Sequence, residues 1–175
     1  MMQMLSKLWL TIFEICRLRL GPQDLPASFS FMVFTLLIYT VVNGLMSLVQ
    51  NTPLETAILA GFAETILSIL LTSSLLYITR HPSRIMQTMT AIASTGSVIG
   101  LIAIPLIIWY QWQIKEHIIG ISFVLLLALI IWSLMVHAHI LRHALTVPFF
   151  TGLTIALIMS FLTYNILSTL FPFSE

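Results

Sequence analysis

The chain has 175 residues, of which 59% are hydrophobic and 7% are charged. A soluble domain carries about 25% charged residues, so this chain has too few to cover a surface that faces water. The net charge of +1 offers no basic patch for nucleic acid, and the single cysteine excludes an internal disulfide. We therefore expect an integral membrane protein whose first partner is the lipid bilayer.

Residues 1–21 are expected to form a short amphipathic helix as a separate N-terminal unit. Its apolar face at helical spacing is formed by Leu5, Leu8, Trp9, Ile12 and Cys16. A short helix that carries Trp and basic residues tends to lie in the membrane interface, which is the preferred interpretation. The alternative is a cytosolic helix packed on the bundle. Gly21 and Pro22 predict where this helix ends.

Residues 22–175 are expected to form a domain of five transmembrane helices. The clearest of them begins at Ile118 and has no charge as far as Val136. At about 1.5 Å per residue it is long enough to cross about 30 Å of hydrocarbon. The predicted spans are residues 29–49, 54–78, 85–110, 118–140 and 148–170, with Ser28, Thr52 and Ser83 as N-caps of the first three. The predicted fold class is an all-α polytopic membrane bundle.

The third span differs from the other four because its first half is rich in hydroxyl and small side chains. Residues 87–100 include Gln, Ser, Thr and Gly at many positions. A helix of this kind should not face lipid on all sides, so we expect it in the interior of the bundle or beside a wet cavity.

Basic residues indicate the orientation of the five spans. With alternating spans, one side of the membrane collects Lys7, Arg17, Arg19, Arg80, Arg84 and Arg142. The other side collects only Lys115. Basic residues in short loops stay on the cytoplasmic side. The prediction is a multi-pass protein of the cell inner membrane with its N-terminus in the cytoplasm and its C-terminus outside.

Glu64 lies about ten residues into the second span and so about 15 Å deep, near the bilayer midplane. A carboxylate there costs several kcal/mol unless it is protonated or paired. No Lys or Arg is expected at that depth, so polar neutral groups are the possible partners. The intramembrane candidates are Tyr39, Asn43, Thr95, Ser97 and Asn165. Glu64 is either a carboxyl that fastens the bundle through hydrogen bonds or a proton- or cation-binding group in a transport path.

Small residues predict where helices pack closely. Ala57 and Gly61 lie on the same side of the second span, and Gly96 and Gly100 form a GxxxG motif in the third. Such stripes let two backbones approach each other. We therefore expect the second and third spans to pack together through these four residues.

Histidines form a second group. The side chains of His137, His139 and His143 are expected at the cytoplasmic end of the fourth span, with His81 in a neighbouring loop. The spacing of four residues between His139 and His143 suits a metal ion. Interfacial histidines without any ligand are the simpler interpretation, so no metal and no cofactor is predicted. Phosphate-binding loops and catalytic motifs are absent from the sequence, which predicts a protein that is not an enzyme.

Two stretches of the chain resemble a known family. Residues Leu18–Ser28 (LRLGPQDLPAS) precede the first span, and His139–Phe149 (HILRHALTVPF) precede the last. Both are similar to stretches of small bacterial inner-membrane proteins of the Yip-domain type. The resemblance implies a five-span fold and a tendency to associate, without an assigned chemistry. Eukaryotic relatives act in vesicle traffic, but this chain lacks their long cytosolic N-terminal region.

Three functions remain open on the sequence alone. The first is a non-enzymatic, Yip-like membrane protein that acts by helix-mediated association with itself or with other membrane proteins, as scaffold or subunit. The second is a small transporter or channel-like protein with Glu64 as its proton or cation site. The third is a metal- or haem-binding membrane subunit that uses the histidines.

Overall fold

A computed structural model of the chain describes residues 2–116 and 120–171. Within these residues all regular structure is helical, and the bundle is all-α as predicted. The helices are α1 (Met2–Cys16), α2 (Phe29–Val49), α3 (Leu54–Ile78), α4 (Ile85–Lys115), α5 (Ile121–Leu145) and α6 (Phe149–Leu170). Helices α2 to α6 are each long and apolar enough to cross a membrane. The chain is therefore a multi-pass membrane protein.

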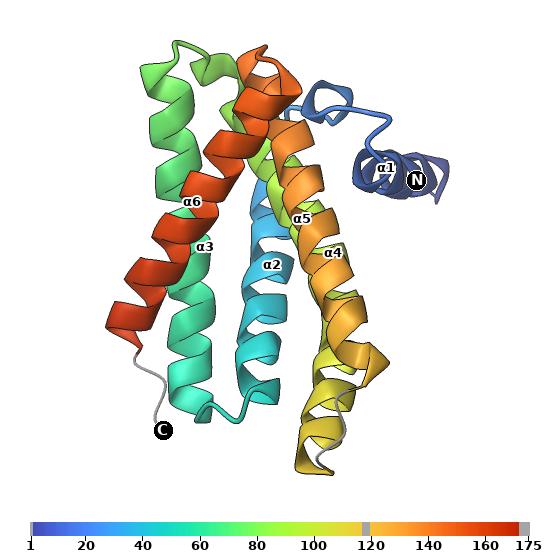
Figure 1. The fold of residues 1–175 in the computed structure, drawn as a ribbon. Coiled ribbons are helices and arrows are strands. Elements are labelled where there is room, and N and C mark those ends of the chain that lie inside the picture. Colours follow the sequence, from blue (N-terminus) through green and yellow to red (C-terminus); the bar gives the residue numbers. More distant parts are fainter. Residues whose placement is uncertain (1, 117–119, 172–175) are drawn as a thin grey trace.

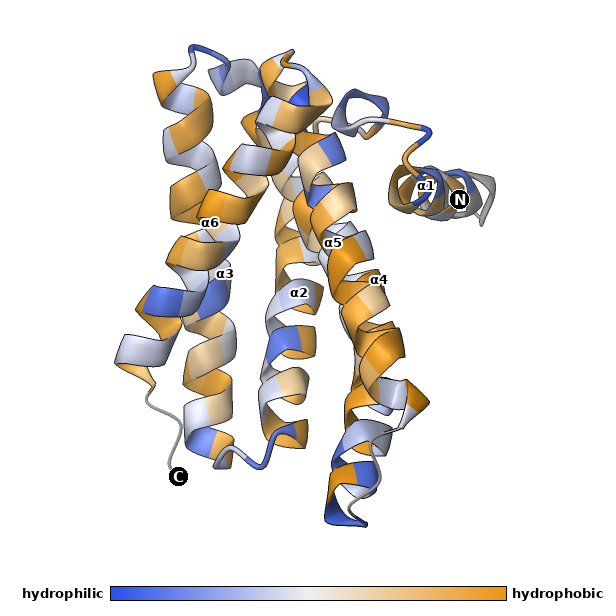
Figure 2. Ribbon diagram, viewed as in Figure 1, coloured by the Kyte–Doolittle hydropathy of each residue, from blue (hydrophilic) through white to orange (hydrophobic). Residues whose placement is uncertain are grey.

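Figure 1 shows the five long helices side by side, with α1 lying across them near one end. That end carries the linker of residues 17–28 and the connectors of residues 79–84 and 146–148, and we call it the basic end. The opposite end, which carries the connector of residues 50–53, the end of α4 at Lys115 and the start of α5 at Ile121, is called the far end. Apolar residues cover most of the five helices, while hydrophilic residues gather in the connectors (Figure 2). This distribution is the one expected for a bundle surrounded by lipid.

The helix bounds follow the prediction closely at the start of the chain and less closely later. Helices α2 and α3 have the predicted bounds. Helix α4 continues five residues beyond residue 110, and α5 continues from residue 140 to Leu145. The predicted start of the fourth span at residue 118 lies outside the described residues. The longer helices arise because backbone hydrogen bonding does not stop where the side chains become polar, whereas the prediction ended each span there.

Only one of the three predicted N-caps is confirmed. Ser28 Oγ accepts a hydrogen bond from the backbone N–H of Phe31 at 3.4 Å. The residues that precede α3 and α4 are Pro53 and Arg84, and neither forms a side-chain cap. Thr52 and Ser83 are therefore wrong as caps, because Pro53 itself leads into α3 and Ser83 belongs to the 3-10 turn that runs into α4.

Helix α1 ends at Cys16, before the predicted stop at Gly21. The chain turns at Leu18, whose φ of 62° is left-handed, while Gly21 has an extended backbone. Ile12 and Cys16 of the predicted apolar face are buried, but Trp9 is 64% exposed. Burial raises the pKa of the Cys16 thiol to about 11. Helix α1 thus packs on the bundle by one face and presents apolar side chains outward by another, as a helix at a membrane interface would.

Helix α2 is the common neighbour of α3 and α4, and this corrects the predicted packing. A Cβ added at Gly61 of α3 would lie 2.8 Å from the backbone oxygen of Thr40 in α2. A Cβ at Gly100 of α4 would lie 2.6 Å from the side chain of Val42, also in α2. The small residues therefore let both helices approach α2 and do not pair with each other.

The prediction for the third span is confirmed in its first half. Residues 88–100 of α4 are buried except for Gly96 and Val98, which are partly buried. Several of these side chains, including Ile92 and Ile99, pack in one core cluster with Val136 and Ile140 of α5. Most hydroxyl groups of this segment donate to carbonyls one turn earlier in α4 itself, such as Thr88 to Arg84 at 2.8 Å. Self-satisfied hydroxyls allow a polar sequence to form a dry helix–helix core.

Candidate functional site

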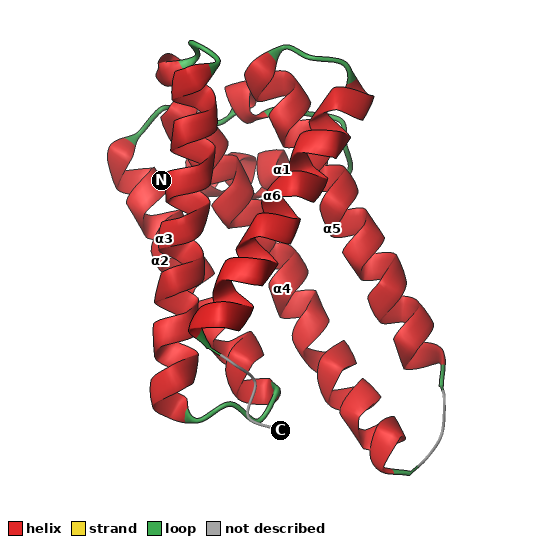
Figure 3. Cartoon of the chain, turned by 60° about the vertical axis from the view of Figure 1, so that its left-hand side comes forward, coloured by secondary structure: helices red, strands yellow, loops and turns green. Residues whose placement is uncertain are grey.

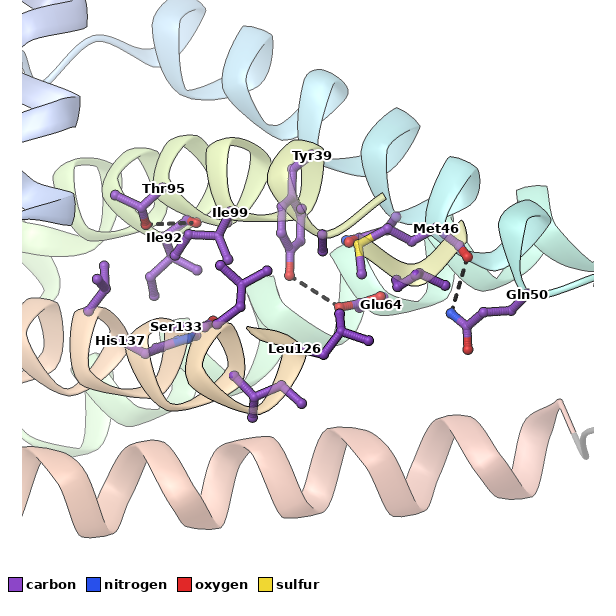
Figure 4. A pocket seen from close by; sticks show the side chains of 18 of the residues that line it. Tyr39, Met46, Gln50, Glu64, Ile92, Thr95, Ile99, Leu126, Ser133 and His137 are labelled. Carbon is purple, nitrogen blue, oxygen red and sulfur yellow. Dashed lines mark hydrogen bonds between the residues drawn. The ribbon is translucent and has the colours of Figure 1, made fainter. Parts of the chain in front are cut away.

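The carboxyl of Glu64 in α3 and the phenol of Tyr39 in α2 face each other in the middle of the bundle (Figure 4). Tyr39 donates a hydrogen bond to Glu64 Oε1 at 3.3 Å. The predicted pairing of Glu64 with Tyr39 is therefore present. An O–H···O hydrogen bond is usually about 2.8 Å long, so this contact is loose and leaves the carboxyl free to take another partner.

Small residues place these two groups opposite each other. Gly61, one turn before Glu64, brings α3 against the backbone of α2 near Thr40 and Gly44. The hydroxyls of Thr40 and Thr65 then lie 2.8 Å apart and join the two helices. This arrangement fixes the backbone on both sides of the carboxyl.

Gly96 of α4 leaves space for the ring of Tyr39. A Cβ at this position would lie 2.7 Å from the ring of Tyr39, so the ring packs directly on the glycine. Any larger residue would have to displace the ring. The GxxxG motif in α4 thus brings α4 close to α2, and its first glycine also makes room for the Tyr39 ring that bonds to Glu64.

Glu64 lines three cavities. The first, of about 500 Å³, lies between α2, α4 and α5 and is walled mainly by apolar side chains. The second, of about 670 Å³, runs from Glu64 to the connector of residues 50–53 at the far end. The third, of about 340 Å³, lies between α3, α5 and α6. A single carboxyl near the bilayer midplane therefore borders space on several sides of α3.

The cavity that reaches the far end is lined by both polar and apolar side chains. Its lining side chains with hydroxyl or amide groups are Ser47, Gln50, Asn51, Thr52, Thr56, Tyr164 and Ser168. These polar groups and this volume suit water, which needs several hydrogen-bonding partners. This cavity connects Glu64 with the far end of the bundle.

Two buried polar atoms beside Glu64 have no partner within the described residues. One is Nδ2 of Asn43, which borders the cavity between α2, α4 and α5. The other is Nε2 of His137, which borders that cavity and the one between α3, α5 and α6. Buried polar atoms without a partner are costly, so such groups indicate a place where water or a ligand completes the structure.

The other predicted intramembrane residues have separate positions. Thr95 borders the same cavity as Glu64, but its hydroxyl donates to Ala91 of its own helix at 2.7 Å. Ser97 donates to Ala93 and lies on the side of α4 that faces α1. Asn165 is exposed on α6 and donates to Phe161 at 2.8 Å. Thr95, Ser97 and Asn165 are therefore wrong as hydrogen-bond partners of Glu64, because each satisfies its group along its own helix.

The histidines divide into two places. The rings of His139 and His143 lie 4.6 Å apart at the basic end, where His139 Nε2 is 3.0 Å from the backbone oxygen of Leu20. His137 borders the intramembrane cavities, and His81 is in the connector before α4. Among residues 2–116 and 120–171, no group of three or more His, Cys, Asp or Glu could hold a metal ion.

Sequence reasoning did not assign His137 to the site of Glu64. The prediction placed it at the end of the fourth span, because that span was taken to stop at residue 140. Helix α5 continues to Leu145, eight residues past His137 and so about 12 Å further along the helix. Counting from the true end of the helix would have placed this side chain inside the membrane.

Comparison with known protein families, with curated proteins and with solved structures gives no match. The resemblance to Yip-domain proteins stays a prediction that rests on residues 18–28 and 139–149. The fold brings these two stretches into contact at the basic end through the hydrogen bond between His139 and Leu20.

Proposed function

We propose that this protein is a small transporter or channel-like protein in which Glu64 binds a proton or a cation. The observation that carries the proposal is the position of Glu64, which is loosely paired with Tyr39 and borders a cavity with a partly polar lining that extends to the far end. An ionisable group inside a membrane is costly and is kept where it handles ions or protons. A carboxyl that only fastened the bundle would be expected to be enclosed and fully hydrogen-bonded.

Helix-mediated association, the first function open on the sequence, loses its main support. It was motivated by the small-residue stripes, and Gly61, Gly96 and Gly100 pack against α2 within the same chain. These residues therefore offer no free surface to another protein. Association with itself or with other membrane proteins stays a prediction. We do not propose a metal- or haem-binding role.

We also propose that the basic end faces the cytoplasm of a cell with the protein in its inner membrane. The fold places Arg17, Arg19, Arg80 and Arg84 at that end and Lys115 at the other (Figure 1). This distribution agrees with the rule that short basic loops remain cytoplasmic. The cavity that reaches the far end would then open toward the outside.

Cysteine labelling in intact cells tests the orientation. A cysteine introduced at Asn51, in the far-end connector, should react with a maleimide that cannot cross the membrane. A cysteine at Ser83, at the basic end, should react only after lysis. The native Cys16 is buried and should contribute little background. Labelling of position 83 alone in intact cells would reverse the proposed orientation.

Flux into proteoliposomes tests the transport proposal. Vesicles that contain the purified protein are loaded with a pH-sensitive or a sodium-sensitive dye, and a membrane potential is imposed. We expect entry of protons or Na⁺ above that of protein-free vesicles, and we expect Glu64→Gln to reduce it to the protein-free level. Glu55→Gln, on the exposed first turn of the same helix, is the matched control and should keep the flux.

The proposal fails on either of two outcomes. Wild-type vesicles could show no flux of either ion, or Glu64→Gln could carry the same flux as wild type. Helix content and elution from a sizing column show whether the Gln variant is folded. The charge-conserving variant Glu64→Asp gives a second reading, since it should keep part of the flux.

A further inference from the structure

The cavity between α2, α4 and α5 combines one acidic group with apolar walls. Its apolar lining includes Ile92, Ile99 and Ile107 of α4 and Leu126, Leu129 and Val136 of α5. Glu64 and Tyr39 stand at its side (Figure 4). A volume of about 500 Å³ lies within the range of about 300–1,000 Å³ of cavities that hold small organic ligands.

Among the described residues, the cavity linings contain an acidic side chain but no Lys or Arg to neutralise it. In the described part of the chain, the residues that border the three cavities include no Lys, Arg or Asp, and Glu64 is their only acidic member. A carboxylate in a medium of low dielectric constant attracts a cation strongly and excludes an anion. The charge of the site therefore selects a ligand with one positive charge.

The lining of this cavity argues against a divalent metal ion as its occupant. An ion such as Ca²⁺ takes six to eight oxygen ligands, usually with several carboxylates among them, whereas Glu64 is the single carboxylate among the described residues that border this cavity. An organic cation needs no such shell, because its apolar groups cover its charge. Aromatic rings favour such cations through their negative faces, and Tyr39 and Tyr110 both border the cavity.

We propose that this cavity binds a hydrophobic monovalent organic cation, which takes the place of a proton on Glu64. The inference rests on the proposed function and names the ligand class of that site. The apolar body of the ligand lies among the isoleucine and leucine side chains, and its charge lies against the carboxyl. Asn43 Nδ2 faces the same space and can donate to a polar group of the ligand.

Exchange with a proton gives the site a defined pH dependence. The titratable groups that border the three cavities with Glu64 are Tyr39 of α2, Tyr110 of α4, His137 of α5 and Tyr164 of α6. A fall in pH protonates Glu64, and the loss of its negative charge weakens cation binding. By linkage, bound cation must likewise weaken proton binding.

Binding of tetraphenylphosphonium to the full-length protein in detergent tests the inference. We expect saturable binding that weakens as the pH falls. Glu64→Gln should weaken it at least tenfold, or about 1.4 kcal/mol. Glu64→Asp should keep most of the binding, and Glu55→Gln should bind as wild type does. Tetraphenylborate has the same shape and the opposite charge, so it should not bind to the site.

Three outcomes would overturn the ligand class. They are no saturable binding by the wild-type protein, equal binding by Glu64→Gln, and binding of tetraphenylborate as tight as that of tetraphenylphosphonium. If wild-type proteoliposomes still conduct protons or Na⁺ through Glu64, the proposed function survives and only the organic cation is wrong. If both the binding and the flux are missing, both proposals are wrong.

Discussion

Helix α3 contacts α2 along one flank and α6 along another, and the two flanks are packed in different ways. Toward α2, Gly61 allows contact between backbones and Thr65 shares a hydrogen bond with Thr40. Toward α6, Leu75 packs against the core cluster that contains Ala156 near the basic end, but a cavity of about 670 Å³ separates the helices near the far end. Figure 3 shows α2 and α3 overlapping on one side of the bundle, while α4 and α5 extend along the other side.

This difference shows how a membrane protein can keep a partly polar space open in its interior. Lipid gives helices little hydrophobic reason to close a gap, so close packing arises where small residues permit it. The α2 flank has such residues and becomes a rigid support. The α6 flank presents Tyr164, Leu167 and Ser168 instead, and a partly polar cavity remains beside Glu64.

The largest expected effect comes from breaking the tight flank. Gly61→Ala places a Cβ 2.8 Å from the oxygen of Thr40 and 2.9 Å from the nitrogen of Gly44, both backbone atoms that cannot yield alone. We expect it to destabilise the protein by about 1–3 kcal/mol, the usual cost of overpacking. Thermal unfolding in detergent, followed by circular dichroism, measures the change.

Gly44→Ala on the same flank is the matched control. Its Cβ would meet the nearest atom, the backbone oxygen of Ala57, at an ordinary 3.5 Å. Because Ala favours a helix over Gly by about 1 kcal/mol, this variant should be as stable as wild type or more stable. Equal destabilisation by both substitutions would show that the close approach is not specific to Gly61.

A smaller effect is expected from the hydrogen bond that joins the two helices on this flank. Thr40→Val and Thr65→Val each remove one hydroxyl of the pair at 2.8 Å. Hydrogen bonds between membrane helices contribute on average about 0.6 kcal/mol, because each hydroxyl can also bond within its own helix. Both residues have such an alternative acceptor here, the carbonyls of Leu36 and Gly61, so the hydroxyl that donates across the pair gives up its bond within its own helix. A double-mutant cycle should give a coupling near that value, and a coupling of zero would remove the bond from the support of the site.

The smallest effect is expected on the outer side of α6. Asn165 is exposed, and within the described residues its side chain bonds only to Phe161 of its own helix. Asn165→Leu should change stability by no more than about 0.5 kcal/mol, as substitutions away from specific contacts do. Flux and cation binding should also be unchanged. A loss of either activity would mean that Asn165 contributes to the site, as the sequence alone predicted.

Predictions from the sequence succeeded where one physical factor dominates. The apolar runs are long enough to cross a bilayer, so the bounds of α2 and α3 could be read directly. The depth of Glu64 and of Tyr39 follows from helical rise, and their pairing is present. The hydroxyl-rich half of α4 had to be shielded from lipid, and it is buried.

Only the tertiary structure decided which helix lies against which. A stripe of small residues shows that a backbone can come close, but it does not name the neighbour, and both predicted stripes turned out to contact α2. The same uncertainty applies to polar groups of equal depth, since depth gives one coordinate and rotation about the helix axis gives the other. Rotation turns Asn165 outward and brings His137 to the cavities beside Glu64. Spacing along the sequence determines the depth of a side chain in the membrane. Only packing among all five helices determines the direction in which it points around its helix axis.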